Sequence, residues 1–181
     1  MGNSDDQSGF TLVELLMVVA IIGILVTILV PHAIRAIHRA KQRSTMKEIQ
    51  SISTIMTDYL TDHGRVLDQN GTYTVGDAFY TALCPVYVPV IPTRDHWGNA
   101  YHIYGQENCS GIYGVSNSYR EDYIVASLGH DNISESGNDY ITNPGSGLYA
   151  ITGIEIFNYD LVVWNGDWIR APQTRIGRSG S

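Results

Sequence analysis

The side chains that usually carry enzyme chemistry are scattered along this sequence. The six histidines form no His-Glu-x-x-His pattern. The chain also contains no Gly-x-Ser-x-Gly motif, no phosphate-binding loop and no glycine-rich dinucleotide turn. No spacing brings an acid, a base and a nucleophile together on one predicted element. The pattern therefore predicts a protein that is not an enzyme.

One stretch, residues 127–139, is rich in oxygen-bearing side chains. These are Asp131, Asn132, Ser134, Glu135, Asn138 and Asp139. Calcium takes about six to eight oxygen ligands, which these side chains and loop carbonyls could supply, although their spacing is not that of an EF-hand. The stretch is therefore either a calcium-binding loop or an ordinary solvated acidic loop.

The two cysteines, Cys84 and Cys109, form neither a Cys-x-x-Cys motif nor a zinc-like spacing. In an oxidising compartment, a single disulfide between them is the simplest interpretation. Two unrelated buried thiols are the alternative.

A single carboxylate interrupts the longest apolar segment. Residues 10–30 read FTLVELLMVVAIIGILVTILV, which is 21 residues with Glu14 as the only charge. At about 1.5 Å per residue, a helix of this length spans about 31 Å, the thickness of a bilayer core. A carboxylate at mid-membrane costs roughly 2.5–3.5 kcal/mol. Because its own chain offers no partner nearby, Glu14 needs a partner elsewhere or a function.

The segment before the apolar run, MGNSDDQSG, is short and polar and ends in Gly9. It lacks the basic leading region of a secretory signal peptide, and no small-x-small cleavage site follows the run. A cut between Gly9 and Phe10 would leave the membrane anchor on the mature chain. The new α-amino group of a neighbouring subunit could then pair with Glu14 and fix the axial step between subunits. Snorkelling of Glu14 to the lipid headgroups is the alternative.

Periodicity defines the elements that position these residues. After Pro31 an apolar stripe continues at helical spacing: Ile34, Ile37, Met46, Ile49, Ile52, Met56, Tyr59 and Leu60. Gly64 suits the left-handed position after a helix. Short β-type runs follow at residues 73–75, 87–91, 100–104, 123–127 and 161–164. The sequence thus predicts an α+β fold, in which a long N-terminal α-helix packs on a small antiparallel β-sheet head.

Length and charge limit the function further. A chain of 181 residues with 44% hydrophobic residues has room for one modest domain and an appendage. From residue 66 onward the sequence has twelve acidic residues and five basic ones. An acidic head repels phosphate backbones, so we expect no specific nucleic-acid partner.

The residues around the apolar run resemble a known signal. Gly9, Phe10 and Glu14, with the apolar residues after them, resemble the class III signal of type IV pilins and type II secretion pseudopilins. The resemblance implies cleavage after Gly9 by a prepilin peptidase and N-methylation of Phe10. It also implies a precursor in a bacterial inner membrane that the assembly machinery and minor pilins convert into a homopolymeric periplasmic or extracellular filament. Glu14 and Pro31 are the implied assembly residues, because many members carry a helix-kinking proline at the position of Pro31.

Under this resemblance, the chain has three parts. Residues 1–9 are the leader, residues 10–63 a helical stem that spans the membrane at 10–30, and residues 64–181 a β-rich head with a C-terminal extension from about 143. Two features differ from the family. The leader carries Asp5 and Asp6 but no basic residue. Five basic residues follow the span, Arg35, Arg39, Lys41, Arg43 and Lys47, although the family topology places this side outside the cytoplasm.

Two head segments resemble the major pseudopilin of type II secretion systems. The first matches it at Asp95, Trp97, Gly98, Asn99 and Tyr101. The second, residues 127–141, corresponds to a loop that binds calcium in that group. The resemblance implies calcium ligands at Leu128, Asp131, Asn138 and Asp139.

Three functions remain open from the sequence. The C-terminal extension favours a dedicated pilus filament over the major pseudopilin of a secretion system. A membrane-tethered surface adhesin is the third possibility, but a tether has no use for the arrangement of Gly9, Phe10 and Glu14.

Overall fold

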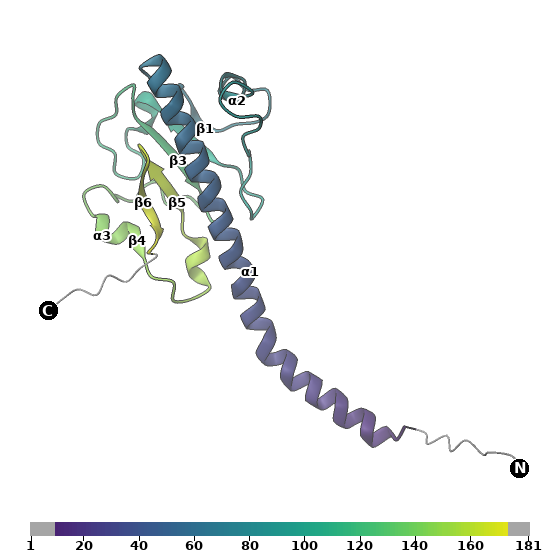
Figure 1. Ribbon diagram of the computed structural model, residues 1–181. Coiled ribbons are helices and arrows are strands. Elements are labelled where there is room, and N and C mark those ends of the chain that lie inside the picture. The colour runs from purple at the N-terminus through teal and green to yellow at the C-terminus, as the bar shows by residue number, and fades with distance from the viewer. Residues whose placement is uncertain (1–9, 174–181) are drawn as a thin grey trace, which may run out of the picture. The chain divides into compact units, whose positions relative to one another are not determined.

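The computed structural model describes residues 10–173, and the chain divides into two units after His38. The first element, α1, is an α-helix at Leu12–His63 that crosses this division (Figure 1). The helix ends where the sequence predicted. Gly64 takes a left-handed conformation with a φ of 67°, and its N–H donates to the carbonyl of Leu60 at 2.8 Å.

The first unit contains the apolar part of α1. Every residue at positions 10–37 is exposed, and Pro31 lies inside the helix. A helix that is apolar all round is stable only when something else covers it, such as lipid or other helices. The predicted stripe residues Ile34 and Ile37 belong to this exposed part and do not join the core.

The second unit combines the rest of α1 with a six-stranded sheet. The strands are β1 at Asn70–Thr72, β2 at His102–Gly105, β3 at Tyr123–Ser127, β4 at Leu148–Tyr149, β5 at Leu161–Trp164 and β6 at Asp167–Pro172. Their order is β1-β2-β3-β5-β6-β4. All neighbouring pairs are antiparallel except β4 and β6, which are parallel. The sheet is therefore mostly antiparallel, as the sequence predicted, with one parallel pair at its edge.

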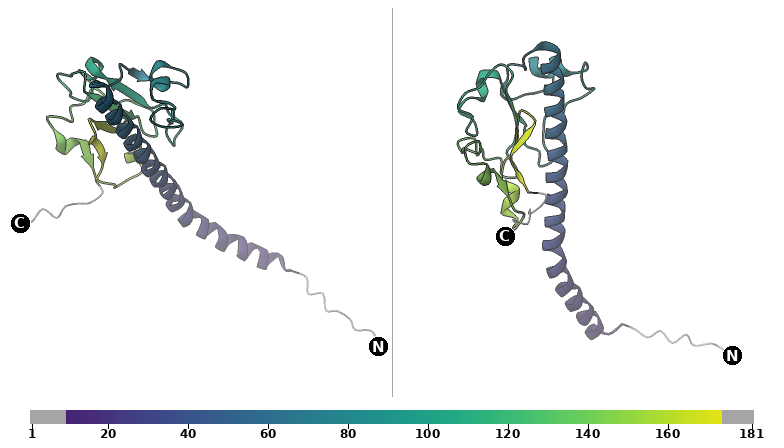
Figure 2. Two further views of the ribbon diagram at one scale, coloured as in Figure 1. Left: turned by 45° about the horizontal axis from the view of Figure 1, so that its top comes forward. Right: turned by 60° about the vertical axis from the view of Figure 1, so that its left-hand side comes forward.

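Short helices connect the strands. They are α2 at Ala78–Leu83, α3 at Pro144–Gly147 and the 3-10 helices η1 at Gln106–Cys109 and η2 at Glu155–Asn158. Figure 2 shows the head part of α1 lying along one face of the sheet, with the loops and short helices around the strands.

The core lies on both faces of the sheet. On one face, Ile52 and Met56 of α1 pack in one buried cluster with Val125 of β3. On the other face, Ile124 of β3 belongs to a second buried cluster, which includes Tyr113 from the loop after η1. Side chains alternate between the two faces along a strand, and both faces are covered here. All five positions of β3 are therefore buried, and this strand forms the centre of the head.

The predicted disulfide between Cys84 and Cys109 is wrong, because both residues are free thiols. Cys84 packs against the cluster on the helix side of the sheet, and Cys109 is fully buried in the cluster on the opposite side. The thiol of Cys109 donates a hydrogen bond to the carbonyl of Tyr104 at 3.4 Å. The sheet therefore separates the two sulfur atoms.

The predicted strand at residues 87–91 is also wrong, because these residues form an irregular connection. Pro89 lies in the middle of this run and has no N–H to donate to a neighbouring strand. The run at 73–75 forms its strand earlier, at Asn70–Thr72, and the run at 100–104 forms β2 at His102–Gly105.

Candidate functional site

The start of α1 is held by a reciprocal cap. The N–H and the hydroxyl of Thr11 both donate to Oε2 of Glu14, at 2.9 and 2.8 Å. The N–H of Glu14 donates to the hydroxyl of Thr11 at 3.2 Å. This arrangement is a capping box, with Glu14 three residues after the capping threonine. The expectation that Glu14 has no partner in its own chain is therefore wrong, although these partners carry no charge.

The helix that follows has the dimensions of a membrane span. An 18-residue window of it has a mean hydropathy of 3.0, and none of that window is buried. Phe10, the predicted methylation position, is 74% exposed just before the helix begins. Gly9 and the rest of the predicted leader lie outside the described residues. The structure thus presents Phe10 and Glu14 at one end of an uncovered apolar helix.

In the head, the two segments that resemble the pseudopilin lie together. Asp95 is buried, and its Oδ1 accepts hydrogen bonds from the N–H groups of Trp97 and Asn99, both at 2.9 Å. Its Oδ2 accepts one from Ser127 at the end of β3, at 2.6 Å. The amide of Asn99 donates to the carbonyl of Gly129 at 2.7 Å. These bonds fasten the first segment to the start of the predicted calcium loop.

The same junction contacts α1. The hydroxyl of Tyr101 donates to Oε2 of Glu48 at 2.6 Å, and Nε2 of His96 lies 3.2 Å from Oε1 of the same carboxylate. The N–H of His96 donates to the hydroxyl of Thr45 at 3.3 Å. The polar residues of this segment therefore join the helix to the sheet.

The four predicted calcium ligands have other contacts within the head. Leu128 has a buried side chain, and Oδ1 of Asp131 accepts a hydrogen bond from the N–H of Ile133 at 3.0 Å. The amide of Asn138 donates to the hydroxyl of Tyr140 at 3.1 Å. Within residues 10–173, no three His, Cys, Asp or Glu side chains gather as a group that could hold a metal ion.

Asp139 is likewise occupied by its own loop. Its Oδ1 accepts hydrogen bonds from the N–H groups of Ile141 and Thr142, at 3.0 and 2.9 Å, and its Oδ2 accepts one from the hydroxyl of Thr142. These bonds, led by the one from the Thr142 hydroxyl, lower the pKa of Asp139. The carboxylate of Asp139 therefore caps a turn of its own loop.

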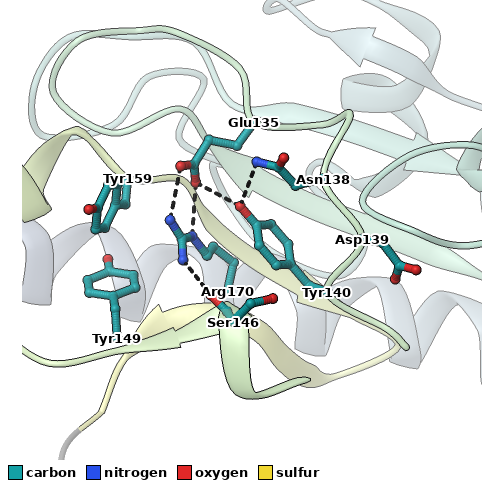
Figure 3. A pocket seen from close by; sticks show the side chains of 8 residues that line it. All are labelled: Glu135, Asn138, Asp139, Tyr140, Ser146, Tyr149, Tyr159 and Arg170. Atoms are coloured by element: carbon teal, nitrogen blue, oxygen red, sulfur yellow. Dashed lines mark hydrogen bonds and ion pairs between the residues drawn. The ribbon is translucent and has the colours of Figure 1, made fainter. Parts of the chain in front are cut away.

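The loop already contains a positive charge, the guanidinium of Arg170 from β6. Its Nε lies 2.9 Å from Oε2 of Glu135 and its Nη2 lies 2.9 Å from Oε1, which makes a bidentate pair (Figure 3). Its Nη1 donates to the carbonyl of Ser146 at 2.9 Å. Only 6% of the residue is exposed.

Three aromatic rings surround the same guanidinium. Its central carbon lies 4.4 Å from the ring centre of Tyr159 and 4.9 Å from those of Tyr140 and Tyr149. Distances of this size permit cation–π attraction. Arg170 and its partners line a cavity of about 540 Å³, in which Figure 3 shows the arginine between the tyrosines and Glu135.

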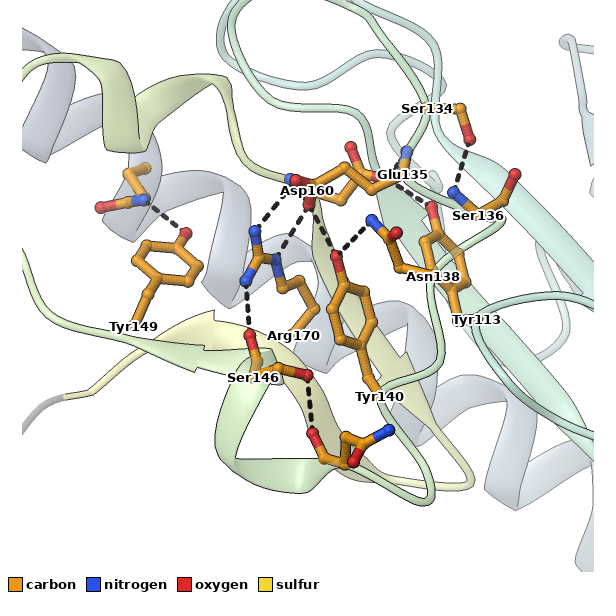
Figure 4. Close-up of polar contacts among 12 residues, drawn as sticks. Tyr113, Ser134, Glu135, Ser136, Asn138, Tyr140, Ser146, Tyr149, Asp160 and Arg170 are labelled. Carbon is orange, nitrogen blue, oxygen red and sulfur yellow. Dashed lines mark hydrogen bonds and ion pairs between the residues drawn. The ribbon is translucent and has the colours of Figure 1, made fainter.

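A second buried acid supports this cluster. Asp160 is fully buried, and its Oδ2 accepts hydrogen bonds from the hydroxyl of Tyr113 at 2.6 Å and the N–H of Glu135 at 2.8 Å (Figure 4). Its Oδ1 has no hydrogen-bond partner within the described part of the chain. Burial raises the pKa of Asp160 to about 6, although the hydrogen bonds from Tyr113 and the Glu135 N–H oppose this shift.

Sequence reasoning missed Arg170 as an organiser of this loop. The available signal was a basic residue inside a strand-like run of the C-terminal region. A charge at such a position needs a partner, but nothing in the spacing identifies Glu135, which lies 35 residues away.

Comparison with known proteins connects the stem and the head. The family described as "Prokaryotic N-terminal methylation motif" matches residues 5–30, which include Phe10 and Glu14. The chain is 29% identical over 104 residues to the type II secretion system core protein G of Aeromonas hydrophila, which covers 54% of this chain and 72% of that protein. It is 38% identical over 60 residues to the type IV major pilin protein PilA of Myxococcus xanthus, which covers 33% of this chain and 27% of that pilin.

The chain therefore carries the N-terminal methylation motif of type IV pilins and is similar in sequence to a type IV pilin and to type II secretion pseudopilins. A match to core protein G of Escherichia coli, 28% identical over 110 residues and covering 56% of this chain and 74% of that protein, agrees with this similarity. The fold of the pilin-like chain, a long helix packed on a small sheet through its second half, agrees with it. No solved structure matches the chain.

Proposed function

We propose that this pilin-like chain is the structural subunit of a type IV pilus-like filament, held in the inner membrane and polymerised through its N-terminal helix. One observation carries the proposal. The methylation motif lies on a helix whose apolar side chains are all exposed at positions 10–37, with one carboxylate in the first turn. Lipid covers such a surface before assembly, and the helices of other subunits cover it in a filament.

The proposed sequence of events follows from these residues. Prepilin peptidase cuts after Gly9, Phe10 becomes the N-terminal residue and is methylated, and its α-amino group meets Glu14 of a neighbouring copy. The hydrogen bonds from Thr11 hold the Glu14 side chain at the helix start. The inner-membrane assembly machinery and minor pilins are the further partners of this step.

The major pseudopilin of a type II secretion system is the second candidate. Core protein G from three bacteria aligns with this chain over 68 to 74% of its length, whereas the PilA alignment covers 27% of that pilin. The strands β4, β5 and β6 of the C-terminal region favour a dedicated filament. Deletion of the gene separates the candidates. Loss of a pilus subunit abolishes surface fibres, whereas loss of a pseudopilin abolishes protein secretion.

Glutamine at position 14 tests the assembly step. Glutamine still accepts the capping hydrogen bonds of Thr11 but has no charge to attract an α-amino group. We expect Glu14→Gln to remain in the membrane at normal levels while the yield of sheared fibres falls by at least about tenfold, the effect of losing roughly 1.4 kcal/mol. Mass spectrometry of the N-terminal peptide reports cleavage and methylation in the same sample.

Thr11→Ala is the matched control. It removes the hydroxyl that takes part in the cap and keeps the carboxylate, so the fibres should persist. Wild-type fibres with an unprocessed N-terminus, or Glu14→Gln fibres at wild-type yield, would contradict the proposal. A wild-type chain displayed only as membrane-bound monomers would instead support a tethered adhesin.

A further inference from the structure

The exposed face of α1 in the head unit carries opposite charges at its two ends. Arg39, Arg43 and Lys47 follow one another at four-residue spacing near the start, and Asp58 and Asp62 lie near the end. All five are exposed. The exposed positions between them are polar and uncharged: Gln50, Ser51, Thr54 and Thr57. The helix face is therefore positive at one end and negative at the other.

The sheet packs on the opposite face of α1, while Arg39 and Arg43 border Ile151, Pro172 and Gln173 at the start of this face. The opposite face of α1 carries Ile49, Ile52 and Met56, which are fully buried against the sheet. The ion pairs of Glu48 with His96, Arg120 with Glu121, and Arg170 with Glu135 do not use the basic row. Asp62 accepts one hydrogen bond, from the hydroxyl of Tyr87 at 2.8 Å.

The basic and acidic residues are spaced so that a second copy, shifted along the helix axis, can pair with both groups. Arg43 and Asp58 are fifteen residues apart, and so are Lys47 and Asp62. Fifteen residues of α-helix rise about 22 Å and return to within about a sixth of a turn of the same face. One axial shift therefore brings both pairs to the same heights at once, and a rotation of the second copy about its own helix axis turns them toward each other.

We infer that this face is a self-complementary interface, where Arg43 and Lys47 of one copy meet Asp58 and Asp62 of a parallel copy displaced by about 22 Å. The inference rests on the proposed filament, in which every anchor points toward the same end and the copies are parallel. In this arrangement the paired charges fix the axial offset between the two contacting subunits.

A second copy fits the face better than a lipid surface does. Anionic headgroups would attract the basic row but repel Asp58 and Asp62 on the same face. A parallel copy satisfies both charge groups with one displacement. Binding to anionic vesicles is therefore the competing outcome in the test.

A charge swap in the full-length chain tests the interface. Arg43→Asp and Asp58→Arg, each alone, put like charges opposite each other, and we expect each to lower the yield of sheared fibres by about fivefold or more. The double variant restores the attraction and should recover most of the yield. Arg120→Asp changes the charge by the same amount on an exposed head loop and serves as the control.

The readouts distinguish this inference from the proposed function. Circular dichroism of each purified variant in detergent checks folding, and helical reconstruction of wild-type fibres measures the axial offset between contacting helices. Three results would overturn the interface but not the proposed function. They are a wild-type fibre yield in the single variants, a double variant whose yield is no higher than theirs, and losses of yield that parallel losses of binding to phosphatidylglycerol vesicles. A wild-type chain that forms no fibres would instead defeat the proposed function.

Discussion

At the scale of single residues, Arg170 is the side chain whose loss should matter most to the head. Arg170→Met removes the partner of Glu135 and leaves a largely buried carboxylate unpaired. Breaking a buried pair from one side costs about 3–5 kcal/mol. We expect a clear fall in the free energy of unfolding, measured by urea denaturation in detergent.

Arg170→Lys keeps the charge but loses the planar fork that binds both carboxylate oxygens, so it should recover part of the loss. Equal stability of the Met variant and the wild type would show that the ion pair contributes nothing.

The same arginine bears on the calcium prediction, which the sequence made for residues 128–139. The guanidinium already neutralises Glu135, and the carboxylates of Asp131 and Asp139 accept hydrogen bonds from their own loop. We therefore expect the melting temperature of the protein to be the same in calcium and in a chelator. A ligand bound to the folded state raises the melting temperature by mass action. A rise that saturates with calcium concentration would restore the predicted metal site.

Asp160 predicts a pH dependence of stability. Burial raises its pKa to about 6, while an unfolded aspartate titrates near about 4. Between these values the folded state holds a proton that the unfolded chain releases. Stability therefore increases as the pH falls from about 7 through 6 and stops increasing near about 4. Tyr113, Glu135 and Arg170 face this carboxyl and set the size of the effect.

Asp160→Asn isolates this contribution from the other carboxylates. The variant should be more stable than the wild type at neutral pH, by about 1–3 kcal/mol, and the difference should disappear toward pH 4. Urea denaturation at several pH values measures the difference directly. A difference that stays constant with pH would contradict the shifted pKa.

At the scale of elements, the contact between α1 and the sheet holds the head together. Ile52 is fully buried on the helix face that packs with β3. Ile52→Ala should destabilise the head by about 2–5 kcal/mol because it removes buried methyl groups and leaves a cavity. Thr54→Ala, two residues along on the exposed face, should change stability by no more than about 0.5 kcal/mol. Similar losses for the two variants would mean that this face contact is not what stabilises the fold.

The elements that the sequence predicted best are those with local signals. The helix was predicted from the apolar run, the stripe from Met46 onward and Gly64. The predicted strands at 123–127 and 161–164 correspond to β3 and β5 with the same bounds. The run at 87–91 failed because composition suggested a strand while Pro89 blocked its pairing. The α+β class depended only on local patterns and was confirmed.

Features that depend on distant residues were not predictable in the same way. The helix face that packs on the sheet includes Gln42, Thr45 and Ser53, which an apolar stripe does not identify. Ser53 is buried, and its Oγ lies 2.9 Å from the hydroxyl of Tyr123, a hydrogen-bond partner 70 residues away. The ion pair of Arg170 with Glu135 is of the same kind, and it changed the interpretation of the loop.

At the scale of the whole molecule, the residues of α1 that are buried in the head and its exposed apolar residues occupy separate lengths of the helix. The buried residues of the helix begin at Gln42, and residues 10–37 are all exposed. A chain that begins at Arg39 should therefore fold, with a free energy of unfolding within about 0.5 kcal/mol of that of the full chain, and be recovered without detergent. A chain that begins at Ser51 loses Gln42, Thr45 and Ile49 and should not fold. Urea denaturation and near-ultraviolet circular dichroism compare the three chains. Failure of the chain from Arg39 to fold would mean that the apolar segment stabilises the head as well as anchoring it.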